Sequence, residues 1–139
     1  MIRFALTLVL TLLPLAAHAA YEDKMGARLR WLDKITARTA TVELRKGETV
    51  RYGDLTIRLQ ACRAQDPLEG ADSAAFLQIW ENKTDTDPEW VFSGWMFASS
   101  PGLSAMDHPI HDVWVLGCLD SVNREPSEAD AQGERGAEE

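Results

Sequence analysis

Apolar and polar residues alternate along the first half of the chain, and this alternation predicts β-strands. Between residues 28 and 60, apolar side chains recur at every second position and polar side chains fill most of the positions between them. The recurring apolar set is Leu29, Trp31, Val42, Leu44, Leu55, Ile57 and Leu59, with Val50 and Tyr52 in a short segment of their own. Strands with one apolar and one polar face are typical of an antiparallel sheet that has water on one side.

After residue 73 the pattern changes, because both faces of the expected strands become apolar. Within each expected strand both faces carry apolar residues: Ala75, Leu77 and Ile79 against Phe76 and Trp80; Trp90, Phe92 and Met96 against Val91, Trp95 and Phe97; and Val113 and Val115 against Trp114 and Leu116. An apolar second face needs cover, because monomers rarely expose patches of more than a few hundred Å².

Polar turns separate these segments at residues 33–34, 45–48, 53–54 and 82–88, and a longer loop is expected at 63–73. No window keeps a 3.6-residue period, so helix content should be small, apart from a short helical turn at residues 101–106. The fold class predicted is all-β: a small antiparallel β-sandwich or a partly closed barrel, of which we favour the sandwich.

The first nineteen residues have the pattern of a secretory signal peptide. Arg3 supplies the positive start, an apolar run of twelve residues follows at 4–15, and Ala17-His18-Ala19 fits a small-x-small cleavage pattern. A bilayer span takes about 20 apolar residues. We therefore expect cleavage after Ala19 and no transmembrane span in the mature chain, rather than an uncleaved anchor.

The opposite end is acidic and has no large apolar side chain. Residues 124–139 cannot bury enough surface to offset their ordering entropy, so we expect a disordered acidic tail there. The remaining residues, 21–123, have the size of one small domain.

Charge and cysteine content narrow the compartment and the partners. The formal net charge of −8, without a basic cluster, argues against a nucleic-acid partner. Cys62 and Cys118 are the two cysteines; they form no Cys-x-x-Cys motif and have no adjacent histidine. We expect a structural disulfide rather than a redox pair, and a periplasmic or secreted protein.

The densest group of chemically capable residues lies close together near the end of the chain: Asp107, His108, His111 and Asp112. Such a group could ligate zinc or another divalent ion, but a loop that contains Pro109 does not hold a defined geometry, so we assign no metal and no cofactor. A Ser100–His108–Asp112 set can be written down, yet Gly-x-Ser-x-Gly is missing and turn chemistry accounts for the serines.

The surplus of tryptophan is the stronger sign of function. Trp80, Trp95 and Trp114 stand in the strands with two apolar faces, and together with His108 they are the tentative binding residues. They could line a groove for a partner, a peptide or a sugar. The alternative is that the 98–112 connection or the N-terminal strand covers them.

Several stretches together resemble a known family. They are Trp31-Leu32-Asp33-Lys34, Val50-Arg51-Tyr52-Gly53-Asp54, Ala74-Ala75-Phe76-Leu77, His108-Pro109, Asp112-Val113-Trp114-Val115-Leu116 and, most specifically, Ser93-Gly94-Trp95-Met96-Phe97-Ala98-Ser99-Ser100-Pro101. The chain resembles, over about residues 28–118, the small exported bacterial proteins grouped as domain of unknown function 2155. The resemblance implies the extent of the fold and export, and no activity, substrate or cofactor.

We therefore expect an exported envelope protein that is not an enzyme and serves as a binding or accessory module for an envelope protein or the cell wall. The alternative is a metal-dependent or hydrolytic enzyme that uses the Asp107-His108-His111-Asp112 cluster.

Overall fold

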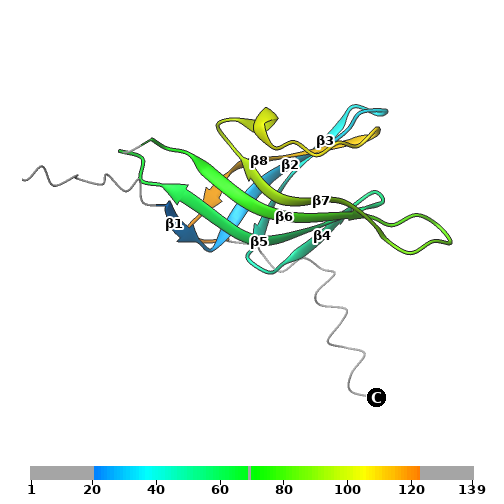
Figure 1. Ribbon diagram of the computed structural model, residues 1–139, viewed down its shortest axis with the longest axis horizontal. Helices are drawn as coiled ribbons and strands as arrows, with labels where there is room; N and C mark the ends of the chain where they lie inside the picture. Colours follow the sequence, from blue (N-terminus) through cyan, green and yellow to red (C-terminus); the bar gives the residue numbers. More distant parts are fainter. Residues whose placement is uncertain (1–20, 69, 123–139) are drawn as a thin grey trace, which may run out of the picture.

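The computed structural model describes residues 21–68 and 70–122, and within them eight strands form two antiparallel sheets packed face to face (Figure 1). The expected signal peptide and acidic tail lie outside the described residues. No helix of the described part has the length and apolar content needed to cross a bilayer.

The first sheet has five strands and is called here the five-stranded sheet. Strand β5 (Leu55–Gln65) pairs with β6 (Ser73–Glu81), and β6 pairs with β7 (Glu89–Phe97). The other edge of β5 is shared by two short strands, β4 (Thr49–Tyr52) at its start and β1 (Tyr21–Lys24) at its end.

The second, three-stranded sheet has the order β3-β2-β8, with β3 at Arg38–Arg45, β2 at Gly26–Asp33 and β8 at His111–Leu119. A 3₁₀ turn, η1 (Pro101–Leu103), lies in the connection from β7 to β8. This confirms a short helical turn in the expected region.

The chain passes between the two sheets at one corner. Met25 separates β1 from β2, and the turn after β3 leads directly into β4; the Lys46 amide donates to the Met25 carbonyl at 2.9 Å across this corner. Backbones approach closely here, since a Cβ on Gly26 would lie 2.5 Å from the Leu44 carbonyl oxygen. On the opposite side β7 and β8 end their sheets, so the architecture is an open sandwich and not a closed barrel.

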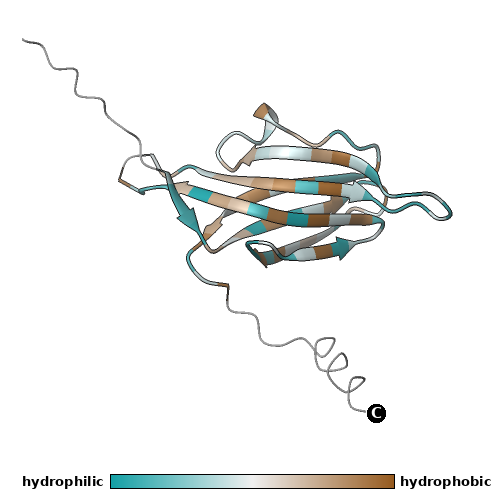
Figure 2. Ribbon diagram, turned by 60° about the horizontal axis from the view of Figure 1, so that its bottom comes forward, coloured by the Kyte–Doolittle hydropathy of each residue, from teal (hydrophilic) through white to brown (hydrophobic). Residues whose placement is uncertain are grey.

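The core between the sheets is made by the side chains expected to point inward. Figure 2 shows the alternation as apolar and polar bands along the strands. Leu44, Leu55, Ile57, Leu59, Leu77 and Ile79 are fully buried. The disulfide Cys62–Cys118 joins β5 to β8, and therefore one sheet to the other, which confirms the expected bridge.

Three expectations are corrected. The exposed polar strand β1 has no apolar alternation, so the pattern does not predict it; its only sheet neighbour in the described chain is β5. Strand β5 continues through residues 63–65, where the pattern predicts a loop. Trp90 does not share a face with Phe92 and Met96: it pairs with Trp80 while Ile79 pairs with Phe92, so a bulge at residue 91 reverses the alternation.

Candidate functional site

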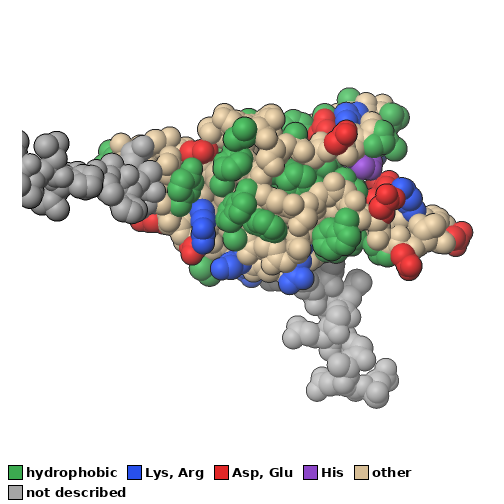
Figure 3. Space-filling model, viewed as in Figure 1, with side chains coloured by type: hydrophobic (Ala, Val, Ile, Leu, Met, Phe, Trp, Pro, Cys, Tyr) green, Lys and Arg blue, Asp and Glu red, His purple; other side chains and the backbone are tan. Residues whose placement is uncertain are grey.

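Aromatic side chains gather on the solvent side of the five-stranded sheet. Strand register places Phe76 opposite Trp95 and Trp80 opposite Trp90, and both pairs meet edge to face, with ring centroids 5.5 and 5.4 Å apart. We call these four residues the aromatic face. Trp90 is 62% exposed and the other three are half-buried; hydrophobic side chains are grouped on this surface in Figure 3.

One end of the aromatic face is hollowed. This hollow, called here the Trp90 hollow, has a volume of about 360 Å³ and is lined by Arg58, Gln78, Trp80, Pro88 and Trp90. The Gln60 amide donates to the Gln78 carbonyl oxygen and so sets the direction of the Gln78 side chain. Arg58 is exposed, and no described carboxylate lies within ion-pair distance of its guanidinium.

The other end of the face has a second hollow, of about 280 Å³, lined by Tyr21, Arg63, Ala74, Trp95 and Phe97. The Arg63 guanidinium lies 5.5 Å above the Trp95 ring, and its Nε donates to Asp23 at 2.8 Å. This hydrogen bond, together with the positive charge, holds the pKa of Asp23 below its ordinary value. The cation in this hollow therefore already has its counter-ion.

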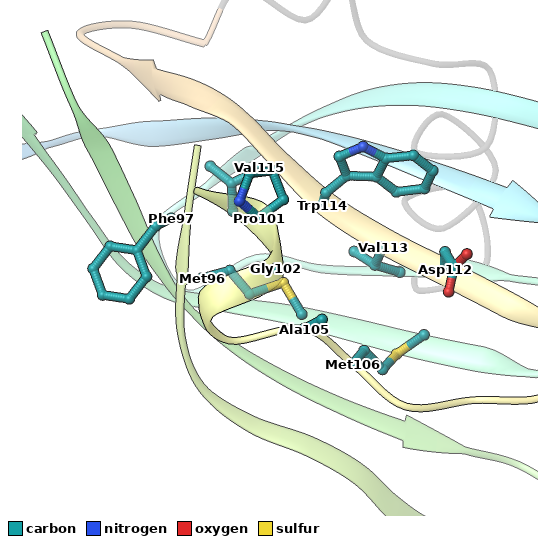
Figure 4. Close-up of a pocket in the computed structure, with 10 residues that line it drawn as sticks. All are labelled: Met96, Phe97, Pro101, Gly102, Ala105, Met106, Asp112, Val113, Trp114 and Val115. Atoms are coloured by element: carbon teal, nitrogen blue, oxygen red, sulfur yellow. The ribbon is translucent and has the colours of Figure 1, made fainter. Parts of the chain in front are cut away.

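Trp114 lies elsewhere, on the three-stranded sheet, because β8 belongs to that sheet and turns its outward positions away from the aromatic face. It lines a cavity of about 240 Å³ at the open side of the sandwich, between the end of β7, η1 and β8 (Figure 4). Met96, Met106, Val113 and Val115 are the buried part of that lining. The expected set of Trp80, Trp95, Trp114 and His108 is therefore not a single groove.

His108 and His111, the histidines of the described residues, lie at the end of the sandwich, in a stack of four rings. Tyr52, Trp31, His111 and His108 follow one another with centroids 5.3, 5.4 and 5.2 Å apart. His111 and His108 are only 5% and 6% exposed. The predicted binding residue His108 is thus buried, apart from the edge that lines a hollow beside Trp90.

Hydrogen bonds define which ring nitrogen of neutral His108 carries the proton. Its Nδ1 accepts the amides of Ile110 and His111 at 3.2 and 3.0 Å, so the proton of the neutral ring lies on Nε2, which is 3.4 Å from Glu81 Oε1. His111 Nε2 is 2.7 Å from Asp54 Oδ1, and its buried Nδ1 has no partner among the described residues.

The structure therefore pairs the histidines with acids other than those expected. Asp112 accepts from Lys34 at 3.3 Å and Asp107 is exposed, and the described residues contain no metal-binding group of three or more ligands. In the same residues no serine hydroxyl bonds to a histidine. Neither the metal cluster nor the Ser100–His108–Asp112 set is assembled.

Sequence reasoning missed Asp54 and Glu81, which lie far from the histidines along the chain. One signal was available for Glu81: it follows Ala75, Leu77 and Ile79 at every second position and so faces the core side, where a carboxylate needs a partner. Asp54 lies in the turn between β4 and β5, and its position gives no such signal.

Two acids, Glu81 and Glu89, line the hollow that His108 and Trp90 share, and both are paired with a lysine. Lys83 bonds Glu89 at 2.7 Å and Glu81 at 3.1 Å. The hydrogen bond and charge of Lys83 hold the pKa of Glu89 below its ordinary value, and the two carboxylates raise the pKa of Lys83.

Comparison with known proteins places the chain among bacterial relatives. An uncharacterized protein of Rickettsia prowazekii (strain Madrid E) is 34% identical over 102 residues, which are 73% of this chain and 65% of the relative, so the chain spans about two thirds of that protein's length. No solved structure matches. Residues 27–118 match the family described as "Uncharacterized protein conserved in bacteria (DUF2155)", and the chain belongs to that family.

Proposed function

We propose that this chain is an exported binding protein of the bacterial envelope, that it is not an enzyme, and that it holds its partner against the aromatic face. The observation that carries this proposal is the exposure of Trp90, paired with Trp80 on a sheet surface that no other described strand covers. Exposed aromatic clusters of this kind concentrate binding free energy.

The environment of the histidines supports a role without catalysis. A hydrolytic site needs a nucleophile within hydrogen-bond reach of its base. His108 is held by two backbone amides and His111 by Asp54, and both lie in a ring stack that fills the end of the core. These groups stabilise the fold at that end.

Export is supported by two independent features. The N-terminal pattern is that of a signal peptide, and the disulfide Cys62–Cys118 is of the kind that forms in oxidising compartments. Fractionation of cells that produce the full chain should recover it outside the cytoplasm, with a mass that lacks residues 1–19. Retention in the cytoplasm with those residues intact would contradict export.

Binding is tested by co-sedimentation of the purified chain with isolated cell envelopes. Trp90→Ala should weaken co-sedimentation by about tenfold or more, because hot-spot aromatics contribute about 2 kcal/mol. Ile35→Ala is the matched control, since Ile35 is 75% exposed in the turn between β2 and β3 of the other sheet. Equal behaviour of the two variants would rule out the aromatic face.

A further inference from the structure

We infer that the Trp90 hollow binds a pyranose ring that carries a carboxylate, as part of an acidic polysaccharide. This inference rests on the proposed function and names the class of ligand for its binding face.

The walls of the hollow fit the apolar side of a sugar ring. Trp80 and Trp90 are inclined by 64° to each other, so they form two walls of a corner, and Pro88 adds a third apolar surface. The face of an indole is electron-rich, and it attracts the partly positive C–H groups that line one side of a pyranose.

One side chain of the lining, Gln78, can donate hydrogen bonds to the hydroxyl groups of a sugar. The carbonyl oxygen of Gln78 accepts the Gln60 amide, which fixes the orientation of the Gln78 carboxamide. No described group accepts from its own NH₂, so two donors remain for ligand oxygens.

Arg58 supplies the charge that selects an acid. Arg58 is exposed and has no ion-pair partner among the described residues. The other residues that line the hollow include no carboxylate, although the protein as a whole carries a net charge of −8. Arg63, at the other end of the same face, is neutralised by Asp23. A guanidinium fork binds carboxylates with two parallel hydrogen bonds.

The position of the hollow in the sheet favours a sugar over an extended peptide. Arg58 lies on β5 and Gln78 and Trp80 on β6, and both strands are paired on their two sides, whereas Trp90 lies on the edge strand β7. A peptide that adds a strand needs a free sheet edge. The centre of this sheet offers side chains only, and these are the aromatic, amide and guanidinium groups that suit a carboxylated sugar.

The test uses a hyaluronan tetrasaccharide and the same tetrasaccharide with its carboxylates reduced to alcohols, titrated into the full chain by calorimetry. The acidic form should bind about tenfold tighter, as a charge-assisted hydrogen bond implies. Arg58→Gln should remove that difference, and Trp90→Ala should weaken the binding of both forms.

Arg51→Gln is the matched control, because Arg51 lies on β4 of the same sheet and outside the lining of the hollow. Equal affinity for the two tetrasaccharides would overturn the inference. So would an equal loss in Arg51→Gln and Arg58→Gln, which would indicate general electrostatic attraction.

Failure of both sugars to bind at about 10 mM would overturn the inference as well. If envelope co-sedimentation still depended on Trp90 in that case, the proposed function would stand with a protein as the occupant. If it did not, both would fall.

Discussion

The two outer surfaces of this sandwich cover the same core but differ in chemistry. On the three-stranded sheet, Arg28 pairs with Glu43 at 2.7 Å across two strands and Arg30 approaches the Thr41 hydroxyl. On the five-stranded sheet the cross-strand pairs at the equivalent outward positions are aromatic, Phe76 with Trp95 and Trp80 with Trp90.

Folding does not explain this difference. Both sheets bury their inward side chains against each other, and either outer surface could be polar without loss of the core. The Arg28–Glu43 ion pair and Arg30 keep those positions of the first surface hydrated, although Trp114 lies on that surface as well. The aromatic rings on the second surface contribute most free energy when another molecule binds there and buries them.

The two outer surfaces exist only while the two sheets remain packed against each other. Removal of the disulfide that joins the sheets is expected to have the largest effect. Cys62→Ala with Cys118→Ala should lower the free energy of unfolding by about 4 kcal/mol, since the bridge joins cysteines that are 56 residues apart in the sequence. Urea unfolding of the double variant and of the wild type measures the loss. A reduced wild type should behave like the double variant; a loss below about 1 kcal/mol would mean that the sheets hold without the bridge.

One position on each of the paired strands β6 and β7 separates the role in the core from the role on the surface. Leu77→Ala removes a fully buried side chain and should cost about 3 kcal/mol, whereas Trp90→Ala, at a 62% exposed position, should cost less than about 1 kcal/mol. Thermal unfolding of both variants tests this. If Trp90→Ala destabilised the fold as much as Leu77→Ala does, Trp90 would be a core residue and the binding face would be lost.

Asp72 holds Tyr21, one of the residues that line the second hollow. Its Oδ1 accepts the Ser73 and Ser99 amides and its Oδ2 the Tyr21 hydroxyl. Partial burial works to raise the pKa of Asp72, but the hydrogen bond of the Ser99 side chain, together with those of the Ser73 and Ser99 amides and the Tyr21 hydroxyl, holds it below the ordinary value of 3.8. Asp72→Asn should therefore cost about 1 kcal/mol at neutral pH.

A carboxylate whose pKa is lowered on folding stabilises the protein above its ordinary pKa, and that stability is lost as the pH falls through the folded value. The difference in free energy of unfolding between wild type and Asp72→Asn should be constant above about pH 5 and shrink below pH 3.8. A difference that does not change with pH would assign the effect to packing.

The smallest effect is expected on the charged surface. A double-mutant cycle on Arg28→Ala and Glu43→Ala should give a coupling of about 0.5 kcal/mol, because both side chains are partly solvated. The coupling should fall in 1 M salt. A coupling above about 2 kcal/mol would mean that this surface, too, is needed for the fold.

The parts of the fold that the sequence predicts are those with a local cause. Inward positions such as Leu55, Ile57 and Leu59 follow from alternation alone, and an even cysteine count predicts the bridge. The pattern misplaces Trp90 because one bulged residue reverses a period of two. The acids that meet the histidines come from other parts of the chain, and no spacing along the sequence encodes those contacts.

The different exposure of the tryptophans makes their intrinsic fluorescence a probe of the outer surfaces. Among the five indoles only Trp31 is buried, at 9% exposure, and four report from the outer surfaces. The 62% exposed Trp90 ring should therefore be the indole that acrylamide quenches most readily, and an occupant of the aromatic face should shield it.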